Sequence, residues 1–152
     1  MIVESLMRGR RTISLSVEAD FPSVRLLAAA CHGVLAEWGL SADRRSLLEL
    51  ALVEAATNVV RHAYGGRGGR VDVELAREGN AIALSVVDSG ASFDPTRVPP
   101  PREPDPADPS TWPEGGMGLP IIRAACDELR YRSEGGRNRL TLHLTVDEPG
   151  GP

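Results

Sequence analysis

The fold is decided by residues 71–88, VDVELAREGNAIALSVVD. Apolar residues occupy alternate positions on both sides of the pair Gly79-Asn80: Val71, Val73 and Leu75 before it, and Ile82, Leu84 and Val86 after it. Alternation with a period of two is typical of strands with one face against a core, and a Gly-Asn pair between them favours a tight turn. The stretch therefore predicts a β-hairpin that ends at Asp88.

One strand and two helices are predicted before this hairpin. Residues 11–19 alternate as a strand does. From Phe21 to Trp38 the apolar residues recur at helical spacing, and a second helical run, rich in Ala and Leu, covers 43–64. The glycines of 65–69 end this run and predict a tight turn into the hairpin.

A proline-rich loop follows the hairpin. Residues 95–114 contain eight of the 12 prolines in the chain, which is incompatible with a helix or a central strand. A loop of this length inside a compact domain indicates a functional lid, and the glycines that close it favour this interpretation. Beyond it we expect a short helix over 119–128 and a second hairpin formed by 129–134 and 138–146.

This element order predicts an α+β fold in two layers. Each amphipathic helix needs a sheet face to cover, so we expect a mixed, mostly antiparallel sheet with helices on one face. A chain of 152 residues leaves no room for a second full domain. We expect one domain at 10–146, with tails at 1–9 and 147–152.

Composition excludes several classes of protein. The net charge of −4 argues against a nucleic acid backbone or an anionic membrane as the main partner. All 17 basic residues are Arg, and the absence of Lys excludes a Walker A lysine, the ATP-pairing lysine of eukaryotic-type protein kinases and a Schiff-base lysine. The distant Cys31 and Cys126 predict buried free thiols, not a disulfide framework or a zinc site. Because no signal peptide or membrane span is evident, we expect a cytoplasmic protein.

Three short motifs carry the candidate chemistry, and the first lies on the second helix. Glu54, Asn58 and His62 are spaced by four residues and so project from one face. Glu can act as a general base, and the Asn side-chain oxygen can bind a hard cation such as Mg²⁺ beside phosphate oxygens. The spacing alone is more typical of a solvated helix face, with His62 as a packing or capping residue.

The other two motifs are VVDSGASFDP at 86–95 and GGMGL at 115–119. In the first, Asp88 can accept a hydrogen bond from an exocyclic amine, and Gly90 lets a flat ring approach the backbone. The alternative is a plain turn, and Phe93 is expected in the core under either interpretation. In the second, glycines lead into a helix N-terminus, which can bind a phosphate or simply form a turn.

Together and in this order, the three motifs resemble the N, G1 and G2 boxes of the GHKL ATP-binding superfamily. The corresponding stretches are VEAATNVVRHAY, VVDSGASFDP and GGMGLPII. Within the superfamily, the chain is similar over roughly 10–146 to the serine-kinase anti-sigma factors of bacterial sporulation and general stress response. No dimerising helix with a phospho-acceptor histidine precedes the domain, so we do not expect a complete sensor histidine kinase.

The resemblance implies roles for individual residues. Asn58 would hold the Mg²⁺ that bridges the ATP phosphates, and Glu54 would take the proton from an incoming hydroxyl. Asp88 would bind the adenine amino group, and Gly90 would give the ring room.

The same resemblance assigns phosphate binding to the third motif. The residues implied there are Gly116, Gly118 and Leu119, with the lid at 95–115 folding over the phosphates. In the lid, Arg97 and Arg102 are candidates for phosphate or partner contacts, although a solvated loop is the better interpretation of each.

The implied function is partner switching. An ATP-dependent serine kinase of this kind phosphorylates a serine on an anti-anti-sigma factor, sequesters a sigma factor and often forms a homodimer, with no direct nucleic acid or membrane partner. Three alternatives stay open: a nucleotide-binding regulatory module without kinase activity, a GHKL ATPase acting on water, and a purely structural origin of the three motifs. The chain departs from the family at Ser92, where some relatives have Gly, and at the strand threonine near the adenine, for which Thr141 is a candidate.

Overall fold

The hairpin predicted at 71–88 lies at the centre of a five-stranded sheet. The computed structural model describes residues 9–99, 103, 105–111 and 118–146. Its strands are β1 (Arg11–Glu18), β2 (Arg70–Glu78), β3 (Ala81–Asp88), β4 (Glu128–Glu134) and β5 (Arg137–Thr145). They are arranged in the order β1-β2-β3-β5-β4, and every neighbouring pair is antiparallel. The predicted α+β fold is confirmed, and the described sheet is antiparallel throughout instead of mixed.

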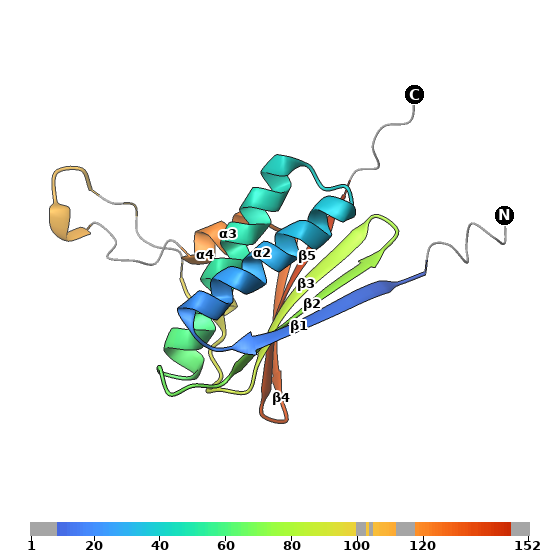
Figure 1. Ribbon diagram of the computed structural model, residues 1–152. Helices are drawn as coiled ribbons and strands as arrows, with labels where there is room; N and C mark the ends of the chain where they lie inside the picture. Colours follow the sequence, from blue (N-terminus) through green and yellow to red (C-terminus); the bar gives the residue numbers. More distant parts are fainter. Residues whose placement is uncertain (1–8, 100–102, 104, 112–117, 147–152) are drawn as a thin grey trace.

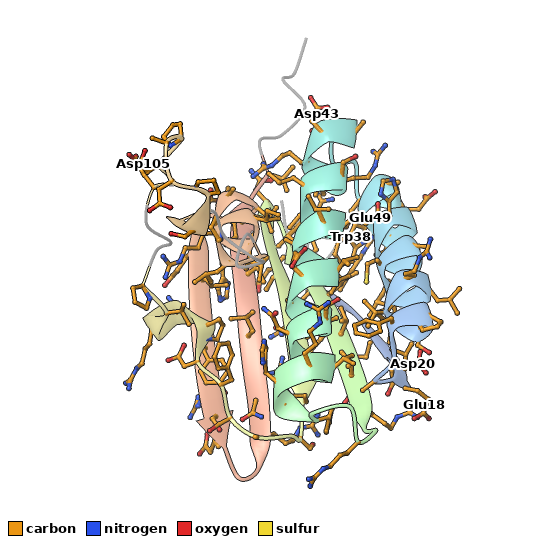
Figure 2. All side chains as sticks on the ribbon, turned by 90° about the vertical axis from the view of Figure 1, so that its left-hand side faces the viewer. Glu18, Asp20, Trp38, Asp43, Glu49 and Asp105 are labelled. Atoms are coloured by element: carbon orange, nitrogen blue, oxygen red, sulfur yellow. The ribbon has the colours of Figure 1, made fainter. Side chains whose placement is uncertain are left out.

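Helices cover one face of this sheet, as Figure 1 shows. They are α2 (Phe21–Glu37), α3 (Ala42–Asn58) and the short α4 (Gly118–Ala124). The side chain of Asp20 caps α2 by accepting a hydrogen bond from the Ser23 amide at 2.8 Å. Helices α2 and α3 lie side by side and run in opposite directions, with Asp20 and Asp43, which mark their beginnings, at opposite ends of the pair (Figure 2).

The core lies between the helices and the covered face of the sheet. The largest side chains that are almost fully buried come from both layers: Val24, Leu27 and Leu35 of α2, Leu48 and Leu52 of α3, and Leu75, Ile82, Leu84, Leu142 and Leu144 of the strands. The opposite face of the sheet carries charged residues in ion pairs, such as Arg137 with Asp72 at 3.4 Å. Burial on one face only accounts for the alternating sequence pattern.

The second helix departs from its prediction near its end. The predicted run of 43–64 is α-helical only to Asn58, and a π-helical turn, η1 (Val59–Ala63), completes it. The Tyr64 amide donates to the Val59 carbonyl at 3.1 Å, five residues earlier, which is the wider turn of a π-helix. This wider turn begins directly after Asn58.

The helix predicted at 119–128 is shorter than expected. It ends at Ala124, because Asp127 already belongs to the sheet pairing. The Asp127 amide donates to the His143 carbonyl at 2.9 Å, and the Asp127 carboxylate accepts from the Thr145 amide at 2.8 Å. These bonds turn the chain into β4.

The described part of the predicted lid contains two short 3-10 turns, η2 (Pro95–Arg97) and η3 (Pro109–Thr111). In Figure 1, η3 lies away from both layers. Arg102 and Gly116 lie outside the described residues. None of the helices described has the length and apolar character needed to cross a membrane. Both cysteines are free; Cys31 is buried as predicted, and Cys126 is only partly buried.

Candidate functional site

The first two motifs meet at a hollow between the helices and the sheet. The hollow is open to solvent, and its empty volume, counted with that open space, is about 420 Å³. It is lined by α3, η1, the end of β3, the loop that follows, and the β4–β5 pair. Most of its lining is apolar, as at Val86 and Leu140, and its polar side chains are those of Asn58, Asp88 and Tyr131. A concave, mainly apolar space with a few polar groups is typical of a small-molecule site.

Glu54 lies beside this hollow, one helical turn before Asn58. Both side chains are partly exposed. A Cβ atom built on Gly118 would lie 2.6 Å from Glu54 Oε2, so the start of α4 approaches the carboxylate as closely as a glycine allows. Gly118 therefore makes room for Glu54. Leu119 lies in the first turn of α4 and is also partly exposed.

Asp88 is held at the edge of the hollow by hydrogen bonds to one of its two carboxylate oxygens. Oδ1 accepts from the Gly90 amide at 2.9 Å and from Asn138 Nδ2 at 2.8 Å. No donor in the described ranges is bonded to Oδ2. Asp88 is only 8% exposed and lines the hollow, so Oδ2 is the acceptor that it can offer there.

Asn138 is a site residue that the sequence did not reveal. It is 3% exposed, and its Nδ2 also donates to the Gly90 carbonyl at 3.0 Å. Its Oδ1 accepts a hydrogen bond from Ser133 Oγ at 2.7 Å. Asn138 reaches Asp88 because the two residues are directly paired in the β3–β5 register.

The strand threonine predicted near this site lies elsewhere. Thr141 is paired with Ser85, and their hydroxyl oxygens are 3.0 Å apart. Three residues separate Thr141 from Asn138, so the two side chains point to opposite faces of the sheet. The structure brings Asn138, and not Thr141, to Asp88.

Gly90 has a packing role that is visible in the structure. A Cβ atom on this residue would lie 2.4 Å from the carbonyl oxygen of Ala63 in η1. The neighbouring Ala91 amide donates to the same oxygen at 2.8 Å. The loop after β3 therefore packs directly on the backbone of η1, which requires a residue without a side chain at position 90.

Two aromatic residues near the hollow differ from expectation. Phe93 is 43% exposed, so the prediction that it lies in the core is wrong. Its ring centroid is 5.3 Å from that of His62, which agrees with a packing role for the histidine. Tyr64, for which the sequence pattern indicates no role, connects the loop after β3 to β2: its hydroxyl accepts from the Ser89 amide at 2.9 Å and donates to the Arg70 carbonyl at 2.8 Å.

Two charged residues outside the hollow, Arg97 and Glu49, contact side chains of opposite character. The side chain of Arg97 is 88% exposed and lies 3.4 Å from the Asp94 carboxylate. Glu49, labelled in Figure 2, contacts His32 Nδ1 at 2.7 Å and so connects α3 to α2. Glu49 therefore forms a contact between the two helices.

Comparison with known proteins identifies the family. A model described as the histidine kinase-like ATPase domain matches residues 17–144. The chain belongs to this family. The resemblance to the GHKL superfamily seen in the sequence is thereby confirmed.

Proteins with similar sequences include two that are named serine-protein kinase RsbW. They come from Bacillus thuringiensis (strain Al Hakam) and Bacillus anthracis (strain A0248), and each is 27% identical over 139 residues. The matches cover 89% of this chain and 86% of each relative.

A solved structure shares the fold. The crystal structure of the RsbU and RsbW domains of Rv1364c from Mycobacterium tuberculosis matches with a TM-score of 0.64 and 21% identity. The match covers 91% of this chain and 33% of that one, so this histidine kinase-like ATPase domain spans about a third of the longer protein.

Proposed function

We propose that this domain is an ATP-dependent protein serine kinase and anti-sigma factor. It phosphorylates a serine on an anti-anti-sigma partner and sequesters a sigma factor. The observation that carries the proposal is that Asn58 and Asp88, which are 30 positions apart in the sequence, line one hollow, with Glu54 one turn from Asn58. The likeness to serine-protein kinases named RsbW over 86% of their length supports the substrate class.

The hollow fits the adenine of ATP. Its apolar walls suit a flat aromatic ring, and the Oδ2 atom of Asp88 can accept a hydrogen bond from one exocyclic amine at its edge. Tyr131 holds the loop after β3 against the hollow, since its hydroxyl accepts a hydrogen bond from the Phe93 amide at 3.0 Å.

Asn58 is the proposed ligand of Mg²⁺. Its side-chain oxygen is a hard ligand of the kind that Mg²⁺ takes alongside phosphate oxygens. When bound, Mg²⁺–ATP supplies the transferable phosphoryl group and a metal that neutralises its charge. Because phosphoryl transfer depends mainly on positioning and charge neutralisation, a chain without Lys can carry it out.

Glu54 is the proposed general base. It is one turn from Asn58 and faces Gly118 at the start of α4, so its carboxylate lies where the third motif meets the first. There it accepts the proton of the incoming serine hydroxyl. Gly118, Leu119 and Gly116, together with the lid, are proposed to surround the phosphates. A cytoplasmic location and a homodimer are parts of the same proposal.

The decisive experiment is transfer of radiolabelled phosphate from ATP to candidate anti-anti-sigma proteins of the same cell. Phosphoserine on one of them supports the proposal. Release of free phosphate from Mg²⁺–ATP without any acceptor would indicate an ATPase instead. Nucleotide binding with neither reaction would indicate a regulatory module without kinase activity.

A further inference from the structure

We propose that Asn138 is a positioning residue that makes the site select adenine over guanine, because it leaves one oxygen of the Asp88 carboxylate open to the base. This inference rests on the proposed binding of ATP. It concerns which nucleotide enters the hollow, and it names residues outside the three motifs.

Asn138 has a fixed orientation. Its two Nδ2 hydrogens are directed at Asp88 Oδ1 (2.8 Å) and at the Gly90 carbonyl (3.0 Å). The Ser133 hydroxyl, 2.7 Å away, donates to its Oδ1. A flip of the amide would place Asn138 Oδ1 against the acceptor oxygens of both Asp88 and Gly90, at a position only 3% exposed. The side chain therefore always presents a donor to Asp88.

The consequence for Asp88 is that its two oxygens are no longer equivalent. Oδ1 already accepts two hydrogen bonds, from Asn138 Nδ2 and from the Gly90 amide. Oδ2 accepts none from the described part of the chain. Asp88 thus behaves toward a ligand as a single acceptor.

The number of open acceptors distinguishes the two purines. The edge of guanine carries two adjacent donors, N1–H and the 2-amino group, and a carboxylate with both oxygens open can accept from both at once. Adenine carries one exocyclic amine next to an acceptor nitrogen. A carboxylate with one open oxygen keeps the adenine contact and loses the two-point contact with guanine.

A purely structural role for Asn138 predicts a different result. If Asn138 only fastens the end of β3 to β5, its removal weakens the binding of all nucleotides in parallel. If Asn138 also occupies one of the two acceptor positions of Asp88 Oδ1, its removal leaves only the Gly90 amide there and opens that position to guanine. The ratio of affinities for GTP and ATP then changes. That ratio is therefore the quantity to measure.

The test is titration calorimetry of the full chain with Mg²⁺ and ATP, GTP or ITP. For Asn138→Ala, the ratio of the GTP to the ATP dissociation constant should fall roughly tenfold, the size of one hydrogen bond to a charged group. ITP has N1–H but no 2-amino group, so its affinity should gain less than that of GTP. Thr141→Ala removes a hydroxyl contact on the other face of the same strand, and it should leave the ratio unchanged.

Ser133→Ala keeps the test decisive if Asn138→Ala fails to fold. Ser133 is exposed, and loss of its hydroxyl removes one of the three hydrogen bonds that hold the Asn138 amide in place. It should shift the ratio in the same direction by a smaller factor. An unchanged ratio in the folded variants overturns the role of Asn138 while leaving ATP binding intact. Failure of the wild-type chain to bind ATP overturns the proposed function itself, and this inference with it.

Discussion

Replacing Asp88 by Asn tests the adenine contact, and the structure predicts how the new side chain orients. Two donors, the Gly90 amide and Asn138 Nδ2, point at the position of Oδ1. The oxygen of an asparagine must take that position, because its NH₂ group there would face two donors. The NH₂ group then replaces Oδ2 at the hollow, so an acceptor becomes a donor.

The size of the effect follows from this exchange. The adenine amine would lose a hydrogen bond to a charged group, which contributes about 1.5–3 kcal/mol. This corresponds to a dissociation constant for ATP that is about 10- to 150-fold higher. Because the bonds to Gly90 and Asn138 are kept, the melting temperature without nucleotide should change little.

The assay is calorimetric titration of Asp88→Asn with Mg²⁺–ATP, paired with a thermal melt without nucleotide. Asp72→Asn is the matched control, since Asp72 lies on the charged face of the sheet and contacts Ser16 and Arg137. It should bind ATP as the wild type does. An affinity of Asp88→Asn within twofold of the wild type would refute the reasoning.

Three further predictions concern other parts of the molecule. Glu54→Gln should bind ATP normally but transfer phosphate roughly 10²- to 10⁴-fold more slowly, as measured with radiolabelled ATP; transfer at the wild-type rate would rule out the base assignment. Gly90→Ala should lower the free energy of unfolding in urea by about 1–3 kcal/mol, because its Cβ would lie 2.4 Å from the Ala63 carbonyl oxygen. Gly33→Ala, with open space around the new Cβ atom, should cause no such loss. Equal unfolding free energies for the Gly90→Ala and Gly33→Ala variants would contradict this packing argument. Burial raises the pKa of the Cys31 thiol from 9.0 to about 12, so the folded state holds the thiol proton more tightly than the unfolded state. This contribution to the free energy of unfolding is fully present below pH 9 and is lost as the pH rises toward 12. Unfolding free energies measured across that range should fall more steeply for the wild type than for Cys31→Ala, and parallel curves would contradict the assignment.

Local patterns were sufficient to predict most of the fold. The alternating runs on either side of Gly79 predicted β2 and β3 within a residue or so of their bounds, since their period reflects burial on one face. Gly79 adopts a φ of +58°, which a glycine takes at no steric cost, so this turn was visible in the sequence. The ends of helices were less predictable, because the π-helical turn after Asn58 and the role of Asp127 depend on contacts with distant residues.

The site was only partly predictable for the same reason. Asn58 and Asp88 were found because each belongs to a short motif, and the structure places both on one hollow. Asn138 could not be found, since its contact with Asp88 requires the register of two strands that are 50 residues apart in sequence. Thr141 was the wrong candidate because the register of β5 against β3 was unknown. A shift of three residues along a strand moves a side chain to the other face of the sheet.

The most direct test of the central claim is a crystal structure of the chain with Mg²⁺ and a non-hydrolysable ATP analogue. We predict that the adenine lies in the hollow with its amine on Asp88 Oδ2, and that the metal is bound by the side-chain oxygen of Asn58. A nucleotide bound elsewhere, or a metal without contact to Asn58, would contradict the account.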